Sequence, residues 1–248
     1  MKTNPFFMSA ENIKIITATL AQRIKRTPTI ESFRFKPQLK VDFIPGQFLQ
    51  VLFDANNPQN RESNKYLSFS SSPTKGYIEV TKRLSKSLFS QNLRNLNPGD
   101  KVLFELPMGM CVFKEEYKKI GFVTGGIGIT PAISIIEYIV ERGMDTDTIL
   151  LYSNRTEDDI AFKKELDYWQ SQTHNIKVHY TITDCQPKDK SCTYGDINKD
   201  LLLEKMADLD ARVVFIFGPP KMVEAMNNVC IEAGCRKENT KTERFTGY

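Results

Sequence analysis

The sequence predicts two consecutive domains, a small antiparallel β-barrel followed by an α/β domain built on a parallel sheet. Between residues 14 and 106, apolar and polar residues mostly alternate, as they do in half-buried antiparallel strands. After Tyr117, short apolar runs such as VVFIF alternate with helical patterns, which is typical of a parallel sheet covered on both faces. The pattern changes at residues 112–119, so we place the domains at residues 1–114 and 115–248.

Six strands and one helix are expected in the first domain. Turn sequences such as Pro45-Gly46 and Pro98-Gly99-Asp100 separate them. Short strands at this spacing favour a small barrel. The expected strands are residues 14–25, 30–36, 47–54, 66–71, 77–84 and 101–106, and the expected helix is residues 87–96.

Four strands and four helices are expected to alternate in the second domain. The expected strands are residues 120–124, 149–153, 177–182 and 213–217. The expected helices are residues 131–142, 158–170, 197–206 and 222–233.

Composition excludes several classes of protein. The 248 residues are 40% hydrophobic and 26% charged, an ordinary globular composition. Five cysteines without a CxxC pair argue against a disulfide framework, a zinc site and an iron–sulfur cluster, so no metal is expected. No run reaches the roughly 18 apolar residues of a membrane span, and the start does not read as a signal peptide. A cytoplasmic monomer is expected, and its evenly interleaved net charge of +4 does not indicate nucleic acid binding.

Three turns fall at the carboxyl ends of expected parallel strands, where ligands of open α/β sheets bind. The first, GGIGITP at residues 125–131, combines glycines with a helix start, which suits an anion such as a pyrophosphate. The second is GPPKM at residues 218–222, and the third carries the hydroxyl of Ser153 and the guanidinium of Arg155. Each motif alone is also compatible with a simple tight turn, but three together favour a dinucleotide site.

The segment KYLSFSSSP, residues 65–73, predicts a strand with a cation at its start and hydroxyl groups at its end. Side chains alternate along a strand, so Lys65 and Leu67 share one face while Tyr66 and Ser68 share the other. The helix start at Ser87-Leu88-Phe89-Ser90 is a second position that favours anions. Read alone, the strand is also compatible with an ordinary sheet edge.

Taken in order, these motifs resemble the ferredoxin–NADP reductase superfamily. They are Pro45-Gly46-Gln47-Phe48, KYLSFSSSP, YIEVTKR, FSQNL, NPGD, GGIGITP, YSNRTEDDIAF, GPPKM and the terminal TERFTGY. The resemblance covers nearly the whole chain. It implies a six-stranded FAD-binding barrel, then a nicotinamide dinucleotide domain, with the flavin in the cleft between them.

In the first domain, the resemblance implies that Lys65 meets the flavin pyrophosphate and that Ser68 lies near flavin N5. Lys65 stands where the family has Arg, and a lysine gives up the planar two-pronged contact. Leu67 stands where the family has an aromatic residue, which can stack on the flavin as a leucine cannot. The implied FAD-binding residues are Lys65, Tyr66, Leu67, Ser68, Thr81, Lys82, Arg83 and Ser90.

In the second domain, the resemblance implies a phosphate loop and a loop beside the nicotinamide. Aromatic residues at the end of the chain are implied to cover the flavin, although a frayed tail is the alternative. Ser68 and Tyr248 are the implied catalytic residues. The implied dinucleotide- and flavin-side residues are Gly126, Gly128, Thr130, Ser153, Arg155, Gly218, Pro219, Met222, Phe245 and Tyr248, with Glu243 as a polar neighbour.

The expected function is an FAD-dependent oxidoreductase that takes a hydride from NAD(P)H to flavin N5. Without an iron–sulfur module, its electrons must go to a separate acceptor such as a ferredoxin, flavodoxin, oxygenase, quinone or free flavin, with an acidic carrier protein as one candidate. Two alternatives stay open: a diaphorase or free flavin reductase that uses flavin as substrate, and a non-catalytic dinucleotide-binding redox sensor. Ser153 and Arg155 slightly favour NADP over NAD, while Glu157 and Asp158 would repel a 2′-phosphate.

Overall fold

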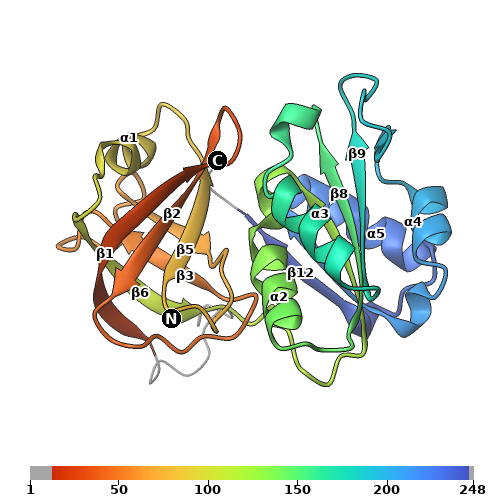
Figure 1. Cartoon of the computed structure of the whole chain (residues 1–248), viewed down its shortest axis with the longest axis horizontal. Helices are drawn as coiled ribbons and strands as arrows, with labels where there is room; N and C mark the ends of the chain where they lie inside the picture. Colours follow the sequence, from red (N-terminus) through yellow and green to blue (C-terminus); the bar gives the residue numbers. More distant parts are fainter. Residues whose placement is uncertain (1–12, 246–248) are drawn as a thin grey trace. The chain divides into compact units, whose positions relative to one another are not determined.

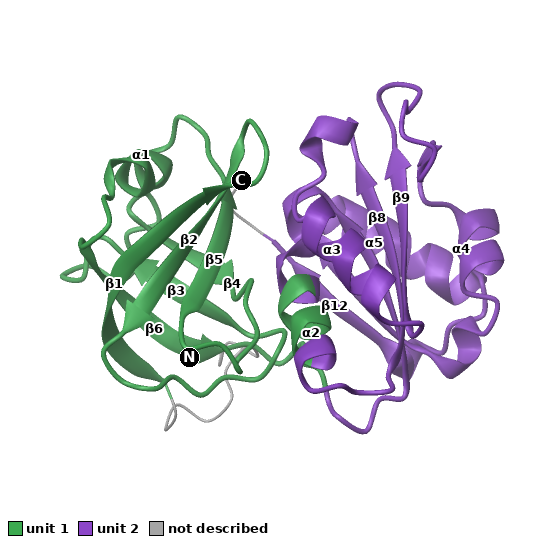
Figure 2. Ribbon diagram, in the orientation of Figure 1, with its two compact units in different colours: residues 1–113, 133–138 green, residues 114–132, 139–248 purple. Residues whose placement is uncertain are grey.

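The computed structural model describes residues 13–245, which form two compact units (Figure 2). The first unit contains the described residues up to Phe113 together with Ile133–Tyr138, and the second contains Lys114–Ala132 and the residues from Ile139 onward. The sequence-based boundary between residues 114 and 115 does not predict that the six helical residues Ile133–Tyr138 group with the first unit.

The first unit is a nearly closed antiparallel barrel, which confirms the predicted fold of this half (Figure 1). Its strands lie in the order β4-β3-β6-β1-β2-β5. Their bounds are β1 Lys14–Lys25, β2 Ile30–Pro37, β3 Phe48–Leu52, β4 Asn64–Ser68, β5 Ile78–Arg83 and β6 Lys101–Met108. The barrel nearly closes where Phe69, just after β4, forms an antiparallel bridge with Val80 of β5.

Aromatic side chains fill the barrel. Phe33, Phe35, Phe69 and Phe104 are fully buried, as expected for the inward positions of alternating strands. Helix α1 (Leu88–Asn95) begins at Ser87, whose Oγ accepts a hydrogen bond of 3.3 Å from the backbone N–H of Ser90. Its buried face adds to the same core.

The second unit is a parallel sheet in the order β10-β9-β8-β7-β11-β12, which confirms the predicted fold of this half. The strands are β7 Lys119–Gly125, β8 Asp147–Asn154, β9 Ile176–Ile182, β10 Cys192–Tyr194, β11 Val213–Gly218 and β12 Thr240–Arg244. The α-helices are α2 Thr130–Glu141, α3 Lys163–Gln172, α4 Lys199–Lys205 and α5 Pro220–Glu232. The 3₁₀ helices are η2 Gly126–Ile129, η3 Glu157–Asp159, η4 Leu209–Ala211 and η5 Lys237–Asn239.

Helices cover both faces of this sheet, with α3 in front of it and α5 behind it in Figure 1. On one face, the rings of Phe122 and Phe215 stack with centroids 5.4 Å apart. On the other face, Leu151 and Ile216 pack in one cluster with Met206, which directly follows α4, and Val223 of α5. Both faces are therefore apolar, which explains the continuous apolar runs of β7, β8 and β11.

Two differences from the expected elements have physical reasons. The helix expected at residues 158–170 is wrong in its first part: residues 157–159 form η3, and α3 begins only at Lys163. Phe162 interrupts it in a left-handed conformation (φ 61°) that lets Phe162 and the neighbouring Ile160 both be buried. The short edge strands β10 and β12 were not expected, because neither carries an alternating apolar pattern.

An ion cluster joins the amino ends of three strands of the second unit. The nearly buried Arg212 donates to the carbonyl oxygens of Ile120 (3.0 Å) and Asp147 (3.1 Å) and pairs with the carboxylates of Asp147 (2.8 Å) and Asp208 (2.6 Å). Burial opposes ionisation, but hydrogen bonds from Lys119 and Arg212 lower the pKa of Asp208 to about 2. The cluster therefore stabilises the fold at the edge opposite the candidate site.

Two of the cysteines have structural roles at the end of α5. Cys230 and Cys235 end α5 in a Schellman motif: the N–H of Cys235 donates to the carbonyl of Cys230 (2.9 Å), around the left-handed Gly234 (φ 105°). Burial raises the pKa of Cys230 to about 12 and that of Cys235 to about 11, so both are poor nucleophiles. Within residues 13–245, no group of side chains is suited to hold a metal ion, and no helix has the length and apolarity of a membrane span.

Candidate cofactor sites

Three predicted FAD-binding cations lie close together on the barrel. Lys65 comes from β4, and Lys82 and Arg83 come from β5. Burial lowers the pKa of Lys82, and the positive charges of Lys65 and Arg83 lower it further. Because Lys65 and Arg83 both repel the charge of Lys82, an anion placed beside Lys82 would stabilise it.

The hydroxyl groups that follow β4 bond mainly inside the protein. Ser70 Oγ lies 2.7 Å from Thr81 Oγ1, which in turn lies 2.6 Å from Ser32 Oγ. Ser71 Oγ accepts a hydrogen bond of 3.0 Å from the backbone N–H of Glu79. Thr81 is only 2% exposed, so its predicted contact with FAD would need a hydroxyl that already has two partners.

Buried ion pairs stabilise the same part of the barrel. The Glu79 carboxylate is 2% exposed and pairs with Arg26 (2.9 Å) and Arg34 (2.6 Å). Arg26 also donates to Ser32 Oγ at 2.8 Å. This network fixes the segment after Ser68, which is itself nearly buried at 8% exposure.

The other predicted residues of β4 point in different directions. Tyr66 is 54% exposed and meets the ring of Phe48 edge-on, with centroids 5.8 Å apart. Leu67 is half-buried and packs against the barrel core. Lys65 is half-buried as well. The structure therefore separates Tyr66 from Lys65, as the alternation along the strand predicts.

Ser90 organises the loop before α1. It is fully buried, and its Oγ accepts hydrogen bonds of 3.1 Å from the Ser85 backbone N–H and from the Ser87 hydroxyl. These bonds order the residues around the first turn of α1, where helix geometry leaves backbone N–H groups without helical partners. The role of Ser90 in binding phosphate stays a prediction.

The glycine-rich loop of the second unit fits closely against its neighbours. Gly126 is left-handed (φ 52°), and its carbonyl accepts a hydrogen bond of 2.9 Å from Tyr152 Oη. A Cβ at Gly128 would lie 2.5 Å from the carbonyl oxygen of Phe217, so no larger residue fits without moving the backbone. Thr130 Oγ1 donates to the Ile127 carbonyl at 3.2 Å, a bond within the loop itself.

Met222 occupies the space that two other glycines leave open. A Cβ at Gly125 or at Gly218 would lie 2.8 or 2.9 Å from Met222 Sδ. Pro219 directly precedes α5, and the backbone N–H of Phe245 donates to the Gly218 carbonyl at 2.9 Å. The GPPKM turn, the glycine loop and Phe245 are thus brought together, whereas Tyr248 lies outside the described residues.

The third turn lies beside an acidic loop. Ser153 is half-buried and Arg155 is exposed at the end of β8. The Arg155 carbonyl accepts a hydrogen bond of 3.0 Å from the backbone N–H of Asp184, and the Glu157 carboxylate accepts one of 2.6 Å from that of Asp189. These backbone bonds tie the turn after β8 to residues 184–189, and Arg155 is the one predicted cation of this turn.

Several buried polar groups at the carboxyl ends of the strands have no hydrogen-bond partner within the part of the chain that the structure describes. They are Thr124 Oγ1, both side-chain amide atoms of Asn154, Thr181 Oγ1 and Glu243 Oε2. Such groups each cost about 1–3 kcal/mol. Burial also raises the pKa of Glu243 to about 8. Asn154 belongs to the motif YSNRTEDDIAF, but neither it nor Thr124 was among the predicted site residues, because their burial without partners depends on the fold.

Comparisons with known proteins match both halves of the chain. Residues 17–113 match the oxidoreductase FAD-binding domain, and residues 122–228 match the oxidoreductase NAD-binding domain. The chain is 30% identical over 220 residues to the uncharacterized oxidoreductase AIM33 of Saccharomyces cerevisiae, covering 86% of this chain and 69% of that protein. It is 28% identical over 227 residues to NADH-cytochrome b5 reductase 1 of Mortierella alpina, covering 89% and 75%. The fold matches that of ferredoxin-NADP+ reductase from Plasmodium falciparum with a TM-score of 0.77 and 15% identity, covering 96% and 98%.

The chain belongs to the ferredoxin–NADP reductase superfamily. This confirms the resemblance seen in the sequence. The chain spans between 49% and 75% of the length of the first curated relatives it matches.

The described residues fit the two cofactors of this superfamily. The mutually repelling cations Lys65, Lys82 and Arg83 suit the pyrophosphate of FAD. The backbone at Gly128 leaves no space for a side chain, because a Cβ there would meet the Phe217 carbonyl, and a glycine loop at a helix start suits a dinucleotide phosphate. The individual contacts of these residues with FAD or NAD stay predictions.

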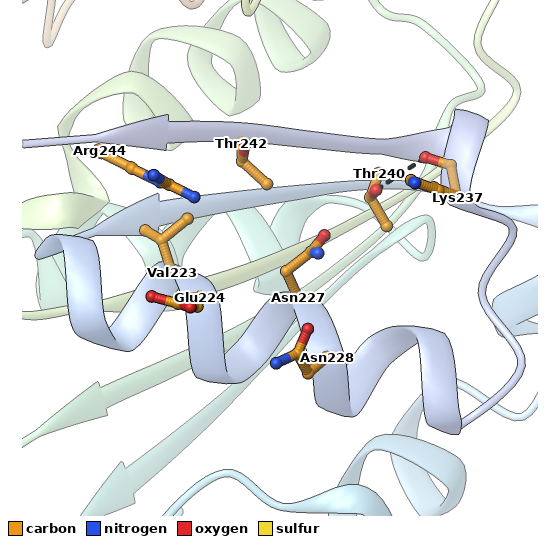
Figure 3. A pocket seen from close by; sticks show the side chains of 8 residues that line it. All are labelled: Val223, Glu224, Asn227, Asn228, Lys237, Thr240, Thr242 and Arg244. Carbon is orange, nitrogen blue, oxygen red and sulfur yellow. Dashed lines mark hydrogen bonds between the residues drawn. The ribbon is translucent and has the colours of Figure 1, made fainter.

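A polar groove of about 400 Å³ lies between α5 and β12 (Figure 3). Its lining residues are Val223, Glu224, Asn227, Asn228, Lys237, Thr240, Thr242 and Arg244. None of the residues predicted to bind FAD or the nicotinamide dinucleotide lines this groove. The groove is therefore a feature separate from the glycine loop.

Proposed function

We propose that this superfamily member is an NADH-dependent FAD oxidoreductase that passes electrons to a separate carrier protein. The observation that carries the proposal is the cluster of Lys65, Lys82 and Arg83 in a domain that matches FAD-binding oxidoreductases. FAD, when bound, would supply the redox chemistry, accepting a hydride from the nicotinamide and giving up electrons to an acceptor. The chain has to supply binding, orientation and a suitable electrostatic environment.

The protein groups divide this work. Lys65, Lys82 and Arg83 would hold the negative charge of the flavin phosphates, and Ser68 would offer a hydroxyl to flavin N5. The N–H groups at the start of η2 and α2 bind the dinucleotide phosphates. Glu243, with a pKa of about 8, holds a proton at its carboxyl group at neutral pH and so adds no negative charge beside the turn at Gly218.

NADH is the proposed donor rather than NADPH, which the sequence pattern slightly favoured. Relatives such as that of Mortierella alpina are named NADH-cytochrome b5 reductases. In this chain, Glu157 and Asp158 lie two and three residues after Arg155, and their negative charge opposes a 2′-phosphate. Arg155 is the feature that favours NADPH, and Arg155→Ala tests it.

An acidic carrier is the proposed acceptor, because positive charge is concentrated in the first domain. Residues 13–113 contain 15 Lys and Arg against 7 Asp and Glu, a formal charge of +8. Residues 114–248 contain 18 Lys and Arg against 22 Asp and Glu, a formal charge of −4. Complementary charge speeds the encounter of two proteins and is screened by salt. Cytochrome b5, named in the relatives, is the first carrier to try.

One observation favours a second candidate, a reductase that releases its flavin. Leu67 packs against the barrel core, which leaves less of its side chain to cover a flavin ring. Together with a lysine at position 65, this predicts weaker flavin retention than in family members with Arg and an aromatic residue. Loss of flavin during gel filtration would favour this candidate over the carrier reductase.

The deciding experiment adds NADH or NADPH anaerobically to FAD-loaded protein and follows flavin absorbance. Bleaching by NADH supports a reductase and excludes a non-catalytic sensor, whereas protein that binds no flavin contradicts every form of the proposal. Transfer to cytochrome b5 should slow as ionic strength rises, while transfer to a neutral quinone should not. The cytoplasmic location and the monomeric state stay predictions, for cell fractionation and sedimentation to test.

A further inference from the structure

We infer that Tyr152 is a positioning residue for the dinucleotide loop, an inference that rests on the proposed function. Tyr152 lies on β8 and is fully buried; it opens the motif YSNRTEDDIAF but is not among the residues predicted to contact a cofactor. Its hydroxyl donates a hydrogen bond of 2.9 Å to the carbonyl oxygen of Gly126. The bond joins the middle of the sheet to the first residue of η2.

The bond acts on the peptide group that the loop must orient. Gly126 is left-handed, and glycine has little intrinsic preference for one backbone conformation, so an outside contact has to fix it. In a trans peptide, the carbonyl and the following N–H point in opposite directions. A bond that holds the Gly126 carbonyl toward Tyr152 therefore turns the N–H of Ile127 away from the Tyr152 side. N–H groups at a helix start are the groups that bind a phosphate.

Two side-chain hydroxyls thus hold two successive carbonyls of the loop. Tyr152 holds Gly126, and Thr130 holds Ile127 through a bond of 3.2 Å. Gly128 is fixed by its close approach to the Phe217 carbonyl. A Tyr152→Phe substitution would remove one of these restraints and leave the ring in place.

The neighbouring strand offers a matched control. Tyr180 of β9 is in register with Tyr152, is 2% exposed, and has its ring centroid 6.3 Å from that of Tyr152. Its hydroxyl donates instead to the Asp167 carboxylate of α3 at 2.7 Å. Tyr180→Phe therefore removes the same atom from the same layer of the core without touching the loop.

The test compares FAD-loaded wild type, Tyr152→Phe and Tyr180→Phe. NAD+ affinity is measured by isothermal titration calorimetry, and KM and kcat are measured with NADH. We expect Tyr152→Phe to weaken NAD+ binding and raise KM by about two- to tenfold, the range for one neutral hydrogen bond, with kcat nearly unchanged. Tyr180→Phe should leave the NAD+ affinity and KM at wild-type values.

Equal NAD+ affinity in Tyr152→Phe and wild type would overturn the inference, as would an equal loss in both variants. If Tyr152→Phe does not fold, Gly126→Ala replaces it, because an alanine strains the same left-handed peptide; unchanged NAD+ affinity there would also overturn it. A wild type that NADH and NADPH both fail to reduce would overturn the proposed function and this inference with it. If NADH reduces the wild type but both variants bind NAD+ as the wild type does, only the role of Tyr152 is overturned.

Discussion

The buried carboxyl of Glu243 predicts that the stability of the second unit falls as pH rises. Glu243 lies on β12, opposite Phe217 of β11, and its Oε2 is buried without a hydrogen-bond partner among the described residues. Burial raises its pKa from 4.5 to about 8 in the folded protein. Replacing Glu243 by glutamine keeps the size of the side chain and removes the titration.

The sign follows from proton binding in the two states. Between pH 4.5 and 8, the folded protein holds the proton of Glu243 and the unfolded chain has lost it, so rising pH favours unfolding. The contribution of the group is fully present below pH 4.5 and is lost as pH rises through about 8. One proton changes the free energy of unfolding by about 1.4 kcal/mol per pH unit, which gives about 3 kcal/mol at most by pH 7.

Urea unfolding followed by Trp169 fluorescence measures this effect. Trp169 is the only tryptophan, lies on α3 of the same unit and is 8% exposed. The difference in the free energy of unfolding, Glu243→Gln minus wild type, should increase by about 1.4 kcal/mol per pH unit from pH 5.5 to 7.5. This difference should level off by about pH 8.5. Glu232→Gln, at an exposed position of α5, is the control for losing a carboxyl group. A constant difference between Glu243→Gln and wild type across this range would refute the reasoning.

Three further substitutions follow from the contacts described above. Gly128→Ala should weaken NAD+ binding at least about tenfold in calorimetry, because its Cβ would meet a backbone carbonyl, whereas Gly76→Ala has open space and should change nothing. Arg212→Met should cost about 1.5–3 kcal/mol in urea unfolding, because it removes the buried guanidinium that bonds to two backbone carbonyls and to the carboxylates of Asp147 and Asp208, while Lys119→Ala should cost less than about 1 kcal/mol; equal costs would contradict a buried role. Lys65→Arg should tighten FAD binding in fluorescence titration, because a guanidinium binds phosphate with two parallel hydrogen bonds, and weaker binding would remove residue 65 from the phosphate site.

The elements that the sequence predicted well carry their own signal. Strand β1 has the expected bounds, and Ile16, Ala18 and Leu20 alternate along it before a bulge between Leu20 and Gln22. The glycine loop was predicted from its glycines between a strand and a helix, and a Cβ at Gly128 would meet the Phe217 carbonyl. Strand β12 was missed because TKTER has no apolar residue and is held by pairing with β11. Because the partner strand β11 is distant in sequence, no local sequence pattern predicts β12.

The same limit applies to the site. The hydroxyl of Thr81 was expected to meet FAD, but its bonds to Ser32 and Ser70 depend on neighbouring chain segments that only the fold brings together. The bond of Tyr152 to Gly126 is hidden from the sequence for the same reason. The sequence contains the difference in formal charge between the two domains. The net charge of +4, which is the sum over the whole chain, does not show this difference.

The central claim is that NADH reduces FAD bound by this chain, for delivery to another protein. Anaerobic addition of one equivalent of NADH to the FAD-loaded protein tests it most directly. We predict that the flavin absorbance bleaches and returns in full when oxidised cytochrome b5 is added. A flavin that keeps its colour with both NADH and NADPH would contradict the claim.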